Sequence, residues 1–165
     1  MAADISTTSS EAQARRLESV YEQVSTLLHQ PDVVQRLRTA PGDHEWSALQ
    51  VIGHMVEMIP YWLHHCHLLI AATLEPPQFG RTLDAPERLA GVESATTRDA
   101  DELLGQLKEA VEAAAKDIRH MSEVEQGKTG IHVRQGTMTV ADVVEQFIIG
   151  HAEAHLIQVQ EALKT

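Results

Sequence analysis

Two histidines stand one helical turn apart in the segment FIIGHAEAHLIQ, residues 147–158. Residues four positions apart lie on the same face of an α-helix, so the imidazoles of His151 and His155 can converge on one metal ion. Apolar residues recur at helical spacing on both sides of the pair, which predicts that it faces the core. A buried imidazole needs partners for its ring nitrogens, and a metal ion is one such partner.

A third candidate ligand, His54, belongs to the apolar stripe of another predicted helix. Side chains from facing helices assemble metal sites in bundle cores. Three histidine ligands leave positions free for water or substrate, which is typical of a catalytic rather than a structural site. Zinc, nickel, iron and manganese all accept imidazole, so the ligand set leaves the identity of the divalent ion open.

Glu57 follows His54 by three residues and therefore shares its helix face. Its carboxylate is a candidate catalytic group for proton transfer, or a partner that positions a ligand. The alternative for Glu57 is a solvated position on the helix surface. The alternative for the three histidines is a structural role at the edge of the core, in which neighbouring side chains satisfy their nitrogens.

The remaining histidines are weaker candidates. In LHHCH, residues 63–67, only His64 and His67 share a helix face. His65 lies eleven residues after His54, roughly 16 Å along a helix axis, so the two cannot share an ion. His132 lies in a predicted loop, where it either reaches the mouth of the bundle or is solvated. Surface positions at helix ends or in loops are expected for His29, His44 and His120.

Four long amphipathic segments predict the elements that position these residues: 10–30, 47–74, 99–121 and 139–163. Ser10 is the expected N-cap of the first, and residues 1–9 are an expected disordered tail. Ser47 and Gln50 form a predicted capping box, and Thr139 with Asp142 starts the last helix similarly. Residues 10–165 are therefore predicted to form one all-α domain, a four-helix bundle. Long connections at 75–95 and 123–138 argue against simple up-down order.

Composition narrows the class of protein. The formal charge is −11 and no segment gathers Lys or Arg, which argues against nucleic acid as a partner. Cys66 is the only cysteine, so neither an internal disulfide nor a cysteine-based zinc site is expected, and we interpret it as structural. There is no secretory signal pattern and no run of about 18 apolar residues that predicts a membrane span. We expect a cytoplasmic protein that acts on a small molecule.

Three segments together resemble the DinB/YfiT-like superfamily of metal-dependent enzymes, which is distinct from the DNA polymerase of similar name. They are Trp46 and Ser47 leading to His54, the run GTMTVADVVEQF at 136–147, and the HAEAH motif at 151–155. The resemblance implies a four-helix bundle with non-sequential helix order and a divalent metal held by His54, His151 and His155. It also implies a homodimer. One departure is Gln50, where many relatives carry an acidic residue.

Activities in the resembling superfamily include metal-dependent hydrolysis and transfer or isomerisation that uses low-molecular-weight thiols such as bacillithiol or mycothiol. We therefore hypothesise a metal-dependent hydrolase or a thiol-dependent S-transferase. The acidic composition disfavours an anionic thiol and so favours hydrolysis, unless the local charge of the pocket differs. The alternative is a non-catalytic, dimeric metal-binding or stress-response protein, which predicts metal without an adjoining pocket. A bundle with structural histidines predicts no metal.

Overall fold

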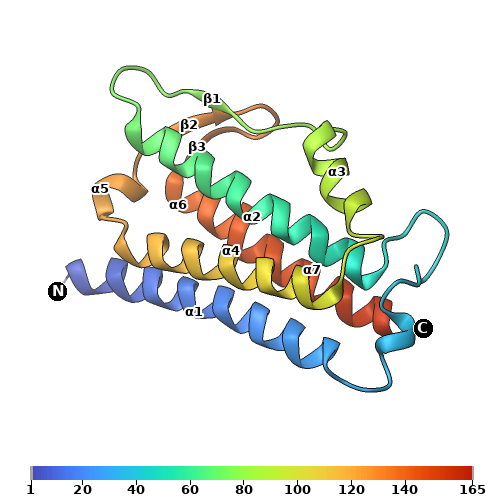
Figure 1. The fold of residues 1–165 in the computed structure, drawn as a ribbon. Helices are drawn as coiled ribbons and strands as arrows, with labels where there is room; N and C mark the ends of the chain where they lie inside the picture. The colour runs from blue at the N-terminus through green and yellow to red at the C-terminus, as the bar shows by residue number, and fades with distance from the viewer. Residues whose placement is uncertain (1, 165) are drawn as a thin grey trace.

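A computed structural model describes residues 2–164 and shows a bundle of long helices (Figure 1). The long helices are α1 (Ala2–Leu28), α2 (Ala48–Ala71), α4 (Ala100–His120) and a last segment made of α6 (Val140–Val143), the π-helical stretch η2 (Val144–Ile149) and α7 (Gly150–Leu163). Shorter helices are η1 (Val34–Arg36), α3 (Pro86–Ser94) and α5 (Glu123–Gln126). The predicted all-α four-helix bundle is confirmed. None of the described helices is long and apolar enough to cross a membrane.

The long helices are not arranged in the order of the chain. Helix α1 packs against α4 and α7, and α2 packs against the same two, so α1 and α2 lie on opposite sides of the bundle. Figure 1 shows that α2 and α4 run in the same direction, so the connection at 72–99, which contains α3, must return along the bundle. The predicted non-sequential order with a long crossover is therefore confirmed. A continuous core joins the helices through side chains such as Leu17, Ile52, Leu107 and Ile148.

Capping side chains explain where two of the long helices begin. The Ser47 hydroxyl accepts from the Gln50 backbone N–H (3.3 Å), and the Gln50 side-chain oxygen accepts from the Ser47 N–H (2.9 Å). Thr139 and Asp142 make the same reciprocal pair, at 3.0 Å in both directions. Each pair satisfies backbone N–H groups that the first turn of a helix leaves without partners. Both predicted capping boxes are confirmed.

The start of the first helix differs from the prediction. Helix α1 begins at Ala2 rather than at Ser10, and Met1 lies outside the described residues. The expected disordered tail over residues 1–9 stays a prediction. Residues 2–9 contain neither Gly nor Pro, so no residue there breaks the helix. Ser10 is therefore inside the helix rather than its N-cap. Its buried hydroxyl accepts a hydrogen bond from Gln126 Nε2 (2.7 Å).

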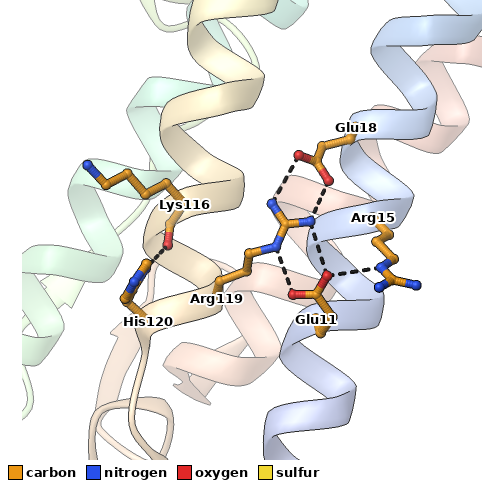
Figure 2. A network of polar contacts seen from close by, with 6 residues as sticks. All are labelled: Glu11, Arg15, Glu18, Lys116, Arg119 and His120. Carbon is orange, nitrogen blue, oxygen red and sulfur yellow. Dashed lines mark hydrogen bonds and ion pairs between the residues drawn. The ribbon is translucent and has the colours of Figure 1, made fainter.

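Polar contacts fix the pairing of α1 with α4. Figure 2 shows Arg119 of α4 between two carboxylates of α1. Its Nε donates to Glu11 (2.8 Å) and its Nη2 donates to Glu18 (2.5 Å). The hydrogen bond from Arg119 lowers the pKa of Glu18. Because one guanidinium contacts carboxylates two turns apart, the network sets how the two helices are aligned along their length.

The two long connections meet in a small sheet that the sequence does not predict. Strand β1 (Gln78–Phe79) pairs in parallel with β2 (Thr129–His132), which pairs antiparallel with β3 (Gly136–Thr139). The sheet packs on α2: a Cβ at Gly130 would lie 2.9 Å from Leu69 Cγ, so only glycine fits there. The sheet therefore fixes both connections beside the helix that carries His54.

Candidate metal centre

The structure brings His54, His151 and His155 together between α2 and α7. One ring nitrogen from each histidine lies within 4.8 Å of the others, and this is the one group of metal-type ligands among residues 2–164. The ring centroid of His54 is 5.5 Å from that of His151 and 4.7 Å from that of His155. Two elements far apart in sequence thus supply three imidazoles to one point.

Three ring nitrogens of this cluster lack hydrogen-bond partners. His54 is 1% exposed, and both of its nitrogens are buried without a partner. His155 Nε2 is buried and unpartnered as well. Buried polar atoms in folded proteins nearly always have a partner, and an unsatisfied one is costly. A divalent ion bound by the three imidazoles would take one nitrogen of each ring, which gives a partner to His155 Nε2 and to one of the two His54 nitrogens, so the residues present fit a metal.

Neighbouring oxygens orient two of the rings. His151 Nδ1 lies 3.2 Å from the Phe147 carbonyl oxygen, and His155 Nδ1 lies 2.8 Å from Gln158 Oε1. Both oxygens can only accept, so each Nδ1 carries the proton and donates, which leaves Nε2 with a free lone pair. Metal-binding histidines commonly use one nitrogen for the ion and donate the other N–H to such an oxygen.

The π-helical stretch η2 places the pair at the edge of the core. Gly150 N–H donates to the carbonyl of Glu145, five residues earlier, and a Cβ at Gly150 would lie 2.9 Å from that oxygen. The buried stripe of α7 runs through Ala152, Leu156 and Val159, so His151 and His155 are half-buried beside it. An uninterrupted 3.6-residue period predicts that the pair lies within the core stripe, and the π-helical stretch interrupts that period. Such π-helical segments frequently occur at functional sites.

Burial keeps the cluster neutral. Desolvation, followed by the neighbouring imidazoles, lowers the pKa of His54 to about 2, and burial lowers the pKa of His151 to about 4. Burial also lowers the pKa of His155, although the hydrogen bond that His155 Nδ1 donates to Gln158 Oε1 raises it. Neutral imidazole is the form that binds metals. All three histidines are therefore competent ligands at neutral pH.

Two cavities reach the cluster from different sides. His54 and His151 line a cavity of about 340 Å³, whose wall includes the stacked rings of Trp62 and Phe147, 4.4 Å apart. His155 lines a second cavity of about 650 Å³ together with Trp46. A small molecule in either cavity would lie beside the histidines.

Glu57 lies next to the site but is already engaged. Its carboxylate accepts from Arg81 at 2.8 and 2.5 Å, and the Arg81 side chain is only 8% exposed. Arg81, rather than Glu57, lines the smaller cavity, and its guanidinium lies 3.8 Å from the centre of the Tyr61 ring. Whether Glu57 moves a proton stays a prediction; its contacts are those of a residue that holds Arg81 in place.

Close packing of α3 on α2 places a second arginine, Arg88, beside the site. A Cβ at Gly53 would lie 2.5 Å from Ala95 Cβ and 2.6 Å from the Gly91 carbonyl oxygen, so the two helices approach backbone to backbone. Arg88 of α3 thereby lines both cavities. Its guanidinium lies 5.3 Å from the Trp46 ring centre. Neither Arg81 nor Arg88 is predicted from the sequence as a site residue, since no local pattern marks them.

His132 is a buried residue of β2 that packs against Phe147, a residue of the cavity wall, rather than a solvated loop residue. It is 2% exposed and stacks on Phe147, with ring centroids 4.9 Å apart. Its Nδ1 accepts from the backbone N–H groups of Arg134 (3.1 Å) and Gln135 (3.2 Å). Gly80, at φ +99°, passes so close that a Cβ would lie 2.7 Å from the His132 ring.

The LHHCH segment stays apart from the cluster. The His65 ring packs on Tyr61 with centroids 4.4 Å apart, while His67 Nε2 lies 2.8 Å from Asp117 on the surface. His64 is exposed. Cys66 is buried, and burial raises the pKa of its thiol to about 12. The thiol is therefore protonated at neutral pH and unreactive, in agreement with a structural role.

Fold and site together define a four-helix bundle that carries a buried three-histidine cluster with adjoining cavities. The chain belongs to the DinB superfamily, whose sequence profile matches residues 11–159. A solved structure with the same fold is YfiT from Bacillus subtilis, described as a probable metal-dependent hydrolase with an unusual four-helix bundle topology. The similarity has a TM-score of 0.76 at 17% identity and covers 94% of this chain and 86% of that one. No curated protein sequence matches this chain.

Proposed function

We propose that this protein is a metal-dependent hydrolase that holds one divalent transition-metal ion on His54, His151 and His155. The observation that carries the proposal is the group of three neutral imidazoles, with unpartnered buried nitrogens on His54 and His155, beside a cavity of about 340 Å³. The description of YfiT as a probable metal-dependent hydrolase supports it, although 17% identity relates the two by fold alone. The cavities favour an enzyme over a protein that only stores or senses metal.

A divalent ion in such a site supplies Lewis acidity, which polarises a carbonyl oxygen or acidifies water. The protein supplies the geometry. The Phe147 carbonyl and the Gln158 side chain accept from Nδ1 of His151 and His155, which leaves Nε2 of both rings free to bind the ion. Trp62 and Phe147 form an apolar wall that limits water and orients a substrate. In this proposal Glu57 positions Arg81 and does not itself transfer a proton.

A second candidate is thiol-dependent transfer, in which a low-molecular-weight thiol is a co-substrate. The observation that favours it is that the cluster lies between two cavities, one at His54 and His151 and the other at His155. Two reactants could therefore approach the same centre from different sides. Hydrolysis needs only one organic substrate, so dependence of turnover on added thiol separates the two candidates.

Metal content is the first test. Untagged protein, prepared without chelators, should contain about one equivalent of a divalent metal, measured by elemental analysis. His54→Ala should lose it, while the matched control His65→Ala, a histidine of the same helix outside the cluster, should keep it. A full equivalent in His54→Ala, or none in the wild type after reconstitution, would refute the proposed centre.

Activity is tested next with panels of ester, amide and thioether-forming substrates, with and without thiol. Turnover should require the metal and should be absent in His54→Ala. The homodimer that the family resemblance implies belongs to this proposal too, and sedimentation velocity of the wild type tests it. A monomer at micromolar concentration would remove the dimer from the proposal and leave the metal centre unaffected.

A further inference from the structure

The cavity beside His54 and His151 has a charge opposite to that of the whole chain. The chain carries a formal charge of −11, yet Arg81, Arg88 and Arg134 all line this cavity. Among the described residues, no Asp or Glu lines it. Arginine guanidinium groups that converge in a pocket are the usual means of binding carboxylate or phosphate groups.

Two of the three arginines form no direct ion pair with a carboxylate of the described residues. Arg81 is paired with Glu57 at 2.5 and 2.8 Å. Within the part of the chain that the structure describes, neither Arg88 nor Arg134 forms an ion pair. Arg88 donates through Nη1 to the Leu83 carbonyl (2.8 Å), which leaves its other N–H groups available. Arg134 is exposed on the turn between β2 and β3.

The rest of the cavity is largely apolar. Trp62 and Phe147 present stacked rings, and Leu83 and Ala154 add further apolar surface. A volume of about 340 Å³ is at the small end of the range for ligand pockets. The best complement is therefore a small molecule with a flat or apolar body and one anionic group.

We infer that this cavity selects small organic anions, whose carboxylate or phosphate group contacts Arg88 and Arg134 while the apolar body packs on Trp62 and Phe147. The inference rests on the proposed function where it assumes that another part of the substrate reacts at the metal. The contacts to the anionic group come from the arginines and not from the metal. It reverses the expectation from the acidic composition, because the charge near the histidines is positive. An anionic thiol is compatible with such a cavity.

Binding of three matched probes tests the inference: phenylacetate, phenyl phosphate and the neutral phenylacetamide. Titration calorimetry on the full chain, metal-loaded and chelator-treated, gives each dissociation constant. At least one anion should bind about tenfold or more tightly than the amide in both forms, since a charge-assisted hydrogen bond is lost in the amide. Whichever anion binds more tightly identifies carboxylate or phosphate as the preferred group.

Arginine variants locate the contact. Arg88→Gln should weaken anion binding about tenfold, and Arg134→Gln about threefold because its pair is exposed to solvent. Arg15→Gln removes the same charge from the exposed surface of α1 and should leave the affinity unchanged. Arg134→Gln keeps the test valid if Arg88→Gln does not fold, because the exposed Arg134 side chain makes no hydrogen bond or ion pair with the described residues. Circular dichroism checks the folding of both variants.

The outcomes separate this inference from the proposed function. Equal affinity for anion and amide, no binding of either anion, or wild-type affinity in the Arg88→Gln, Arg134→Gln double variant would overturn the anion site, whatever the metal content. Protein that takes up no metal but still prefers the anion would refute the metal centre and support the anion site.

Discussion

Lowering the pH from 8 to 5 should destabilise the metal-free protein by about 4 kcal/mol through His54 and His151 alone. Burial lowers their pKa values to about 2 and about 4, from an ordinary value of 6.5. Below pH 6.5 the unfolded chain therefore binds protons that the folded chain does not. Stability is complete above the unfolded pKa and falls as the pH drops towards the folded values.

The magnitude follows from the distance between pH 5 and the unfolded pKa of 6.5. Both folded pKa values lie below pH 5, so each group loses stability over the full interval of about 1.5 units, or about 2 kcal/mol. Carboxyl groups such as Glu18, whose pKa the hydrogen bond from Arg119 lowers from 4.5, titrate below this window. The interval from pH 6.5 to 5 thus reports mainly on buried histidines.

Urea denaturation of chelator-treated protein at pH 8 and pH 5 measures the effect. The His54→Gln, His151→Gln double variant should lose about 4 kcal/mol less than the wild type between the two pH values. His64→Gln, at an exposed histidine of the same helix as His54, should match the wild type. Equal pH dependence in the wild type and the double variant would refute the assignment of these imidazoles as buried and neutral.

Three further predictions follow from single contacts. Ser47→Ala should lower the free energy of unfolding by about 1 kcal/mol in urea denaturation, because it removes the N-cap of α2 without touching the metal ligands. Gly53→Ala should lower the free energy of unfolding by about 1–3 kcal/mol or more, since its Cβ would lie 2.5 Å from the Ala95 methyl group. The matched control Gly105→Ala meets nothing within 4 Å and should stabilise α4 by up to about 1 kcal/mol. Gln158→Leu should weaken metal binding about 10- to 100-fold in chelator competition, because His155 Nδ1 loses its acceptor; unchanged affinity would contradict that role.

The helices and the histidine cluster could be predicted from local rules. Capping boxes depend on residues three apart, so Ser47 with Gln50 marked the start of α2 correctly. His151 and His155 are one helical turn apart and therefore share a helix face. The amphipathic patterns of the two segments predict that His54 faces them across the core. The structure brings the three together, while metal binding by them stays a prediction.

The surroundings of the cluster could not be predicted, because they depend on contacts between distant segments. Parallel pairing of β1 with β2 joins residues about fifty positions apart, and that pairing buries His132. Arg88 reaches the site only because Gly53 and Gly91 let α3 approach α2 closely. The π-helical stretch before His151 changes the helical period, which a regular 3.6-residue pattern does not anticipate.

The arginines and the histidine cluster act on each other. The positive charges of Arg88 and Arg81 contribute to the lowered pKa of His54, which keeps it unprotonated, but they also oppose a nearby metal cation. An anion bound between the arginines and the metal would offset the repulsion between these two positive groups. Metal and organic anion should therefore strengthen each other's binding, and linkage requires the two effects to be equal. Phenylacetate should bind more tightly to metal-loaded than to chelator-treated protein. In chelator competition, added phenylacetate should tighten metal binding by the same factor. If either ligand binds more weakly in the presence of the other, the two sites compete.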